Sequence, residues 1–186
     1  MAGQLQGIRI AALVDDHFEQ VEMTEPKRIW EEAGATVSIV SRNPRLTAMR
    51  HDQPGDRFTT DVALENARPE DFDALFLPGG VMNGDSLRIV PEAQNFARAL
   101  VDAGKPVAVI CHGGWLLISC GLVQGRTMTS WPTLQDDYRN AGAKWVDEPV
   151  VVDNDWISSR KPADIPVFAA EAVRVFAAHA RPSRAA

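Results

Sequence analysis

Apolar runs without regular polar alternation recur along the chain and predict strands that are buried on both faces of a sheet. Continuous runs of Val, Ile, Leu and Ala are typical of parallel strands covered by helices. They comprise "IRIAALV" (8–14), "TVSIV" (36–40), "DALFLPGG" (73–80), which ends in a Pro-Gly-Gly loop, and "VAVI" (107–110); "EPVVVD" and "DWISS" predict two further strands.

Segments with apolar residues at helical spacing separate these strands. We expect helices over about 21–33, 91–103, 112–120, 133–140 and 162–178, an irregular excursion or hairpin over 41–60, and a loop over 81–88. This alternation predicts an α/β fold with a mainly parallel sheet and helices on both faces. The length favours a single domain over 1–186, with 180–186 as a frayed tail.

The composition is that of a soluble globular protein, with 45% hydrophobic and 24% charged residues and a net charge of -6. Stable nucleic-acid binding is not expected, because no cluster of Lys and Arg is present. No signal peptide or membrane-spanning run is recognisable, which predicts a cytoplasmic protein. The two cysteines and four histidines form no metal-ligand pattern, so we expect neither a metal nor a cofactor.

Three predicted strands end in loops that carry chemically useful residues. These loops read "DDHFEQVE" after the first strand, "PGG" after the third and "CHGG" after the fourth. Ligands of open α/β sheets collect at the carboxyl ends of the strands. If the strands are neighbours, the loops converge on one edge of the sheet and predict a site there.

Cys111 falls at a strand-to-helix turn, which is the position of a nucleophile elbow. Gly113 and Gly114 suit that turn, because without a Cβ the helix can start close to the strand. The helix amino terminus favours thiolate over thiol. The N–H of His112, together with that of Gly79 or Gly80, would form an oxyanion hole. The alternative is that Cys111 is a small buried core residue.

The side chains near Cys111 each have a catalytic and a structural interpretation. His112 would act as a base only if the turn swings its ring round to the thiol; otherwise it is a solvent-facing or interface histidine. Glu19 and Glu22 share one helix face, and either carboxyl could be held against the thiol. The alternative is that both are surface residues in the first turn of a helix.

The segments "FEQVEM", "FLPGG", "PVAVICHGGWLLISCGLVQGRTMTSWP", "NAGAKWVDEPVVVD" and "SSRKPADIP" together closely resemble the PfpI-type superfamily. This superfamily includes intracellular cysteine peptidases, the parkinsonism-associated protein deglycase and cofactor-independent glyoxalases. The resemblance covers about 8–176, is nearest the PfpI and general-stress-protein branch, and implies a flavodoxin-like three-layer sandwich. Class I glutamine amidotransferases have a similar fold, but glutaminase activity is not expected because no His-x-Glu motif follows Cys111.

The resemblance also implies roles for individual residues. Cys111 matches the nucleophile that is followed by His112, and Glu22 matches the acid beside the thiol. Glu19 matches a second acid of the same pocket. In PfpI-like members a third acid reaches the histidine from a neighbouring subunit, and Asp85 lies near its place.

Trp131 matches a position that is histidine in the deglycase branch and aromatic in the peptidase branch. The resemblance therefore implies that Trp131 shapes the pocket and is not a base. Family members are mostly dimers, which implies a homodimer or a higher homo-oligomer.

These observations predict a stress-protective hydrolase or lyase whose substrate is a small reactive carbonyl, a glycated protein or a peptide. Cys111 would attack the carbon, Glu22 would transfer a proton, and His112 with Asp85 would assist. Two alternatives remain: a redox sensor that is oxidised at Cys111, and a chaperone-like protein without turnover. Cys120 is expected in the core, about 13 Å along the helix from Cys111 and too far for a disulfide.

Overall fold

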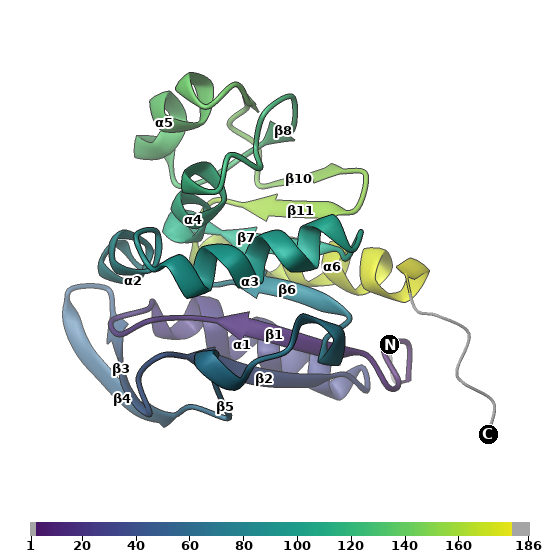
Figure 1. Ribbon diagram of the computed structural model, residues 1–186. Coiled ribbons are helices and arrows are strands. Elements are labelled where there is room, and N and C mark those ends of the chain that lie inside the picture. Colours follow the sequence, from purple (N-terminus) through teal and green to yellow (C-terminus); the bar gives the residue numbers. More distant parts are fainter. Residues whose placement is uncertain (1–2, 180–186) are drawn as a thin grey trace.

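The structure is a computed structural model, and it describes residues 3–179 (Figure 1). A seven-stranded sheet has the order β10-β11-β7-β6-β1-β2-β5, and every neighbouring pair is parallel except β10 with β11. Its strands are β1 (Arg9–Leu13), β2 (Thr36–Ser41), β5 (Val62–Ala63), β6 (Ala74–Leu77), β7 (Val107–Ile110), β10 (Val150–Asp153) and β11 (Trp156–Ser159). Two small sheets pair β3 (Arg45–Arg50) with β4 (Gln53–Thr59), and β8 (Thr127–Met128) with β9 (Lys144–Trp145).

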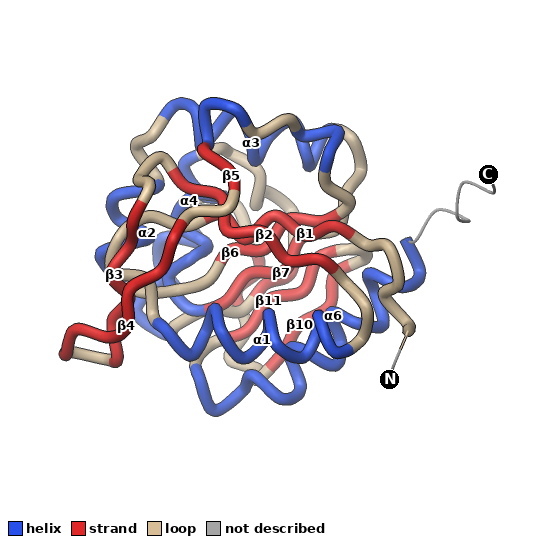
Figure 2. The backbone as a smooth tube through the Cα atoms, turned by 90° about the horizontal axis from the view of Figure 1, so that it is seen from below, coloured by secondary structure: helices blue, strands red, loops and turns tan. Residues whose placement is uncertain are grey.

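Helices cover both faces of the central sheet (Figure 2). They are α1 (Gln20–Glu32), α2 (Val81–Leu87), α3 (Pro91–Asp102), α4 (Gly114–Ser119), α5 (Gln135–Asn140) and α6 (Ile165–His179). In β1, Ile10 and Ala12 join the hydrophobic cluster under α1 and α6, whereas Ala11 and Leu13 join the cluster under α3 and α4. Both faces of the strand are therefore buried, which explains the continuous apolar run. The predicted α/β sandwich is confirmed.

The aromatic side chain of Trp30 ties α1 to α6 and to the sheet. Its ring lies 4.7 Å from that of Phe76 on β6 and 5.4 Å from that of Phe176 on α6. Its indole N–H donates to the Ala169 carbonyl at 3.1 Å. Aromatic pairs at these separations add to the energy gained by burial. This packing fixes the position of α1, the helix that carries Glu22.

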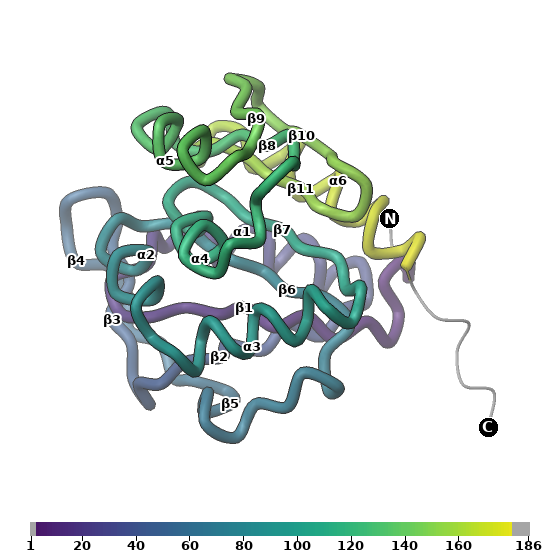
Figure 3. The backbone as a smooth tube through the Cα atoms, turned by 45° about the horizontal axis from the view of Figure 1, so that its top comes forward, coloured from purple at the N-terminus to yellow at the C-terminus, as the bar shows by residue number. Residues whose placement is uncertain are grey.

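The strand order places the carboxyl ends of β1, β6 and β7 side by side. The chain runs from β1 outward to β2 and β5, and then returns to the other side of β1 as β6 (Figure 3). The loops after β1 and β6 therefore leave the sheet towards opposite faces, and ligands of such sheets collect at this point. An added Cβ on Gly80 would lie 2.7 Å from the Glu19 nitrogen, and one on Gly79 would lie 2.5 Å from Cys111 Cβ. The predicted convergence of the three loops is therefore found.

Some local elements differ from those predicted. Residues 81–87 form helix α2 where a loop was predicted. For residues 41–60, which were predicted to form an irregular excursion or a hairpin, the structure has the β3–β4 hairpin. The α2 sequence contains Asn83 and Gly84, both poor helix formers, and tertiary packing stabilises the turn. None of the helices within residues 3–179 is long and apolar enough to cross a membrane. The predicted frayed tail, 180–186, lies outside the described residues.

Candidate active site

Cys111 occupies a strained backbone position at the end of β7. Its φ is 60°, in the left-handed region that non-glycine residues rarely adopt. The chain continues from Cys111 as a single 3-10 turn over Cys111–Gly113 and then as α4. Strain of this kind persists only where the surroundings hold it, and it is concentrated at functional sites.

Two glycines allow the close packing around this turn. A Cβ on Gly113 would lie 2.5 Å from the Leu77 carbonyl oxygen, so Gly113 packs directly against the end of β6. Gly113 therefore shapes the backbone of the turn, and its place in the pocket lining stays a prediction. A Cβ on Gly79 would lie 2.1 Å from Glu22 Oε2 and 2.5 Å from Cys111 Cβ. Gly79 is the spacer that brings the carboxyl and the thiol together.

Glu22 is a buried carboxyl beside the thiol. Its side chain is 0% exposed, and neither oxygen makes a hydrogen bond of ordinary geometry within residues 3–179. Burial, and then the charge of Glu19, raise its pKa to about 8, while the Cys111 thiol and the Gly79 N–H lower it. A carboxyl group with this pKa is mostly protonated at neutral pH and can either donate or accept a proton.

The Cys111 thiol does not ionise as readily as the sequence predicted. Burial raises its pKa well above the usual value, and the nearby Glu22 charge raises it further. The N–H groups of Gly80 and His112 donate towards the sulfur and lower the pKa, but they do not offset burial. The expected benefit from the helix terminus is small because α4 has only six residues. The residue is 7% exposed.

His112 does turn back towards Cys111, although it is the adjacent residue. Its Nδ1 lies 3.2 Å from Cys111 Sγ. Its ring stands edge-on to Trp115 at 5.0 Å and stacks at 6.0 Å with Trp131. Desolvation lowers the pKa of His112 to about 4, so the imidazole is neutral at physiological pH. A neutral ring can share a hydrogen bond with the sulfur but is a weak base.

The remaining predicted residues lie at different distances from this centre. Trp131 borders the site, since its N–H donates to the Cys111 carbonyl at 3.4 Å. Glu19 raises the pKa of Glu22, and one of its carboxylate oxygens accepts from the His51 N–H at 3.0 Å. Asp85 is exposed on α2 and makes no hydrogen bond or ion pair with His112 within the described chain. Cys120 is buried and, like Cys111, a free thiol.

Two residues near the site were missed from the sequence. Trp115 packs on His112, and its indole N–H donates to Asp137 Oδ2 at 2.8 Å. Its position three residues after His112 in a predicted helix was a usable signal. Asn83 is fully buried beside the Pro-Gly-Gly loop. It was missed because the segment that carries it was predicted to be a loop.

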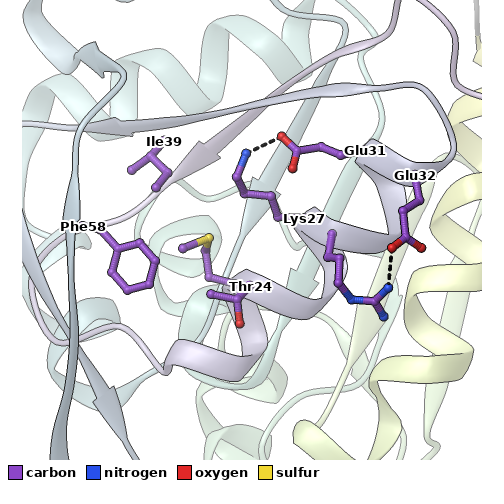
Figure 4. A pocket seen from close by; sticks show the side chains of 8 residues that line it. Thr24, Lys27, Glu31, Glu32, Ile39 and Phe58 are labelled. Atoms are coloured by element: carbon purple, nitrogen blue, oxygen red, sulfur yellow. Dashed lines mark hydrogen bonds and ion pairs between the residues drawn. The ribbon is translucent and has the colours of Figure 1, made fainter.

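A hollow of about 410 Å³ lies elsewhere, beside α1 and next to Ile39 on β2 and Phe58 on β4 (Figure 4). Met23, Ile39 and Phe58 contribute its apolar part. Its charged walls are paired with each other: Lys27 with Glu31, and Arg28 with Glu32. Neither Cys111 nor Glu22 lines it, so this hollow is separate from the candidate active site.

Comparisons with known proteins identify the family of this chain. The DJ-1/PfpI family model matches residues 8–175. The chain belongs to the DJ-1/PfpI family. A deglycase from Pyrococcus abyssi is 40% identical over 168 residues, which cover 90% of this chain and 99% of the relative. A putative cysteine protease from Bacillus subtilis is 37% identical over 168 residues, covering 90% of this chain and 97% of that protein.

The fold of this DJ-1/PfpI member also matches solved structures. Drosophila melanogaster DJ-1beta superposes with a TM-score of 0.83 at 23% identity, over 95% of this chain and 91% of that one. At this identity the likeness shows the fold alone. The resemblance inferred from the sequence motifs is thus confirmed at the level of the family.

Proposed function

We propose that this protein is a cysteine-dependent enzyme that hydrolyses carbonyl-derived adducts, as a deglycase does. The observation that carries the proposal is the contact of Cys111 with the buried Glu22 on one side and His112 on the other. The family relatives named deglycase and putative cysteine protease support a hydrolytic reaction at a carbonyl or acyl carbon.

In the proposed reaction, the adduct first isomerises: Glu22 moves the proton of its carbinol carbon to the neighbouring ketone carbon, and the carbinol hydroxyl proton passes to the ketone oxygen. The amine is then held on an acyl carbon. Ionised Glu22 next removes the thiol proton as Cys111 Sγ bonds to that acyl carbon. With a pKa of about 8, Glu22 is a far stronger base than His112, yet its ionised fraction near neutral pH is still useful. The electron pair of the carbonyl moves to its oxygen. The strained φ of Cys111 makes the turn a nucleophile elbow, which aims the sulfur away from the sheet.

Backbone N–H groups stabilise the developing oxyanion. The N–H groups of Gly80 and His112 already donate towards the sulfur, so they lie near the position where the oxyanion forms. The Gly79 N–H faces Glu22 and stabilises its ionised carboxylate, which is the form that accepts the proton. In this assignment Gly80 and His112 form the oxyanion hole.

The intermediate then collapses and the leaving amine takes the proton from Glu22. A water molecule attacks the bound carbon, passes a proton to Glu22 and releases the acid product, and Cys111 Sγ regains its proton. His112 Nδ1–H holds the sulfur during these steps, in the tautomer without a proton on Nε2. The complete cycle returns Glu22 to its starting state.

We also propose that the active form is a homodimer or a larger assembly in a reducing, cytoplasmic setting. Val81 and Met82 on α2 are 53% and 52% exposed, close to Asp85 in the sequence. Covering these apolar side chains with a second copy would bring an Asp85 carboxylate near His112. Such a neighbour would raise the pKa of His112 and strengthen it as a base.

A panel of substrates tests the proposal. Turnover of methylglyoxal, methylglyoxal-modified amines and thiols, and peptides is compared for the wild type, Cys111→Ser and the control Cys120→Ser. We expect turnover of the modified amines or thiols, abolished by Cys111→Ser and retained by Cys120→Ser. Wild-type rates in Cys111→Ser would reject the proposal. Turnover of peptides alone would assign a protease.

A redox sensor is the weaker alternative. Oxidation begins with the thiolate, and burial raises the pKa of Cys111. A chaperone-like role does not explain the strained turn at Cys111 or the buried Glu22 carboxyl. Selective sulfenic acid formation at Cys111 under mild peroxide, without turnover of any substrate, would favour the sensor.

A further inference from the structure

Asn83 on α2 makes three hydrogen bonds although it is fully buried. Its side-chain Oδ1 accepts from the Asp15 N–H at 2.7 Å. Its Nδ2 donates to the carbonyl oxygens of Pro78 and Gly79, both at 3.1 Å. The orientation of the carboxamide is unambiguous, because one end faces a donor and the other faces two acceptors.

The two carbonyls that Asn83 holds belong to the peptide groups of the Gly-Gly loop. The Pro78 carbonyl shares a planar peptide with the Gly79 N–H, and the Gly79 carbonyl shares one with the Gly80 N–H. In a trans peptide the C=O and the N–H point in opposite directions. Drawing both carbonyls towards Asn83 therefore turns both N–H groups away from it.

Both N–H groups point at the candidate active site. That of Gly79 donates towards the Glu22 carboxyl, and that of Gly80 donates towards the Cys111 sulfur. A single side chain thus sets the direction of two N–H groups, one towards each member of the acid–thiol pair.

The loop needs such a restraint because two glycines follow each other. Glycine rotates through conformations that other residues avoid, and Gly80 has a φ of 101°. The Gly79 carbonyl also accepts from the Glu19 N–H at 3.1 Å. Asn83 bonds the carbonyls on both sides of the Gly79 Cα and so fixes two peptide planes together.

The other end of Asn83 is held by a rigid part of the fold. Asp15 follows the end of β1 and is 2% exposed. Its carboxylate accepts from the Asp16 N–H and the Asn43 side chain, and it lies 2.7 Å from the Arg42 guanidinium. These contacts fix the Asp15 backbone, so the Asp15 N–H is a stable anchor for Asn83.

We propose that Asn83 is a positioning residue that directs the Gly79 and Gly80 N–H groups towards Glu22 and Cys111. It does not touch the substrate and acts only through the two carbonyls. The proposal rests on the proposed function in so far as Cys111 is the nucleophile.

Alkylation of Cys111 tests this role without any substrate. The rate with iodoacetamide is measured against pH in a Cys120→Ser parent and in the same parent carrying Asn83→Ala or Asn83→Asp. Asn83→Asp keeps the shape and the acceptor for the Asp15 N–H but removes the donors to the loop carbonyls. The loss of an aligned N–H donor to the thiolate should slow alkylation about tenfold at pH 8. Gln94→Ala on α3, which loses a side-chain hydrogen bond to the Arg88 carbonyl, is the control and should alkylate at the parent rate.

The outcomes separate this proposal from the proposed function. Folded Asn83 variants with slower alkylation support positioning, and a lower kcat with an unchanged KM would extend it to turnover. Parent alkylation rates in Asn83→Asp would overturn it, even if Cys111→Ser abolishes turnover. Loss of cooperative urea unfolding in both Asn83 variants, but not in Gln94→Ala, would also overturn it and make Asn83 a purely structural residue.

Discussion

Glu22 and Cys111 meet across Gly79 at a separation that leaves no room for a methyl group. A Cβ at position 79 would lie 2.1 Å from Glu22 Oε2 and 3.1 Å from Cys111 Sγ. Both groups are buried. The Glu22 charge raises the pKa of Cys111, whereas the adjacent Cys111 thiol lowers the pKa of Glu22. Their protons are therefore coupled, and the pair titrates as a unit.

Gly79→Ala should separate the pair. The added methyl group must push Glu22 or Cys111 aside, and overpacking of this kind costs about 1–3 kcal/mol of stability. We expect turnover to fall about 100-fold, because a small misplacement of reacting groups has effects of that size. Steady-state kinetics and urea unfolding measure the two effects.

Gly104→Ala is the control for that substitution. Gly104 has a φ of 69° and no atoms within 4 Å of an added Cβ. Its replacement strains the backbone by roughly 1 kcal/mol but leaves the site intact. Equal activity in Gly79→Ala and Gly104→Ala would contradict the role of Gly79 as a spacer.

Glu22→Gln should stabilise the protein at alkaline pH. The folded-state pKa of about 8 lies above the value near 4.5 of a free carboxyl, so the folded state binds more protons between these pH values. The wild type therefore loses stability as pH rises from about 4.5 to 8, and the uncharged amide of the variant avoids that loss. The gain is on the order of a few kcal/mol at pH 9. Denaturant unfolding from pH 5 to 9 measures it, and a difference that does not change with pH would contradict burial of Glu22.

The His112 imidazole should remain neutral down to about pH 4. Its folded-state pKa of about 4 lies below the usual 6.5, so the unfolded state binds more protons between these values. His112 therefore destabilises the fold as pH falls from about 6.5 to 4. NMR titration of the ring measures the pKa, and a value near 6.5 would contradict the account of its desolvation.

Trp115→Ala tests whether the Trp115 ring causes the desolvation of His112. The Trp115 ring shields the imidazole at 5.0 Å, and its removal admits water. The pKa of His112 should then rise towards 6.5. An unchanged pKa would show that Trp115 does not contribute to the desolvation.

The sequence was sufficient to predict the main strands, most of the helix positions and the place of the site. Continuous apolar runs identify buried strands, because in β1 alternate residues enter different clusters. The "PGG" and "CHGG" loops converge because parallel strands present their carboxyl ends on one edge. The Glu22 carboxyl was identified from the family pattern, since local sequence alone allowed a surface residue.

Other features depend on tertiary contacts that no local pattern shows. Helix α2 was missed because Asn83 and Gly84 are weak helix formers. The burial of Asn83 was missed for the same reason. The raised pKa of Cys111 was missed because the sequence interpretation counted the stabilisation of the thiolate by the helix terminus but not its destabilisation by burial. Asp85 is exposed and makes no hydrogen bond or ion pair with His112 of its own chain, so the predicted contact requires a second copy of the chain.

The most direct test of the account is the ratio of Cys111 alkylation rates in the wild type and in Glu22→Gln across about pH 6 to 10. Below about pH 8 Glu22 is protonated and can donate to the thiolate, whereas above it the carboxylate opposes thiolate formation. We predict that the ratio of wild type to variant falls as pH passes about 8. A ratio that stays constant over this range would show that Glu22 and Cys111 do not share a proton, and would contradict the proposed mechanism.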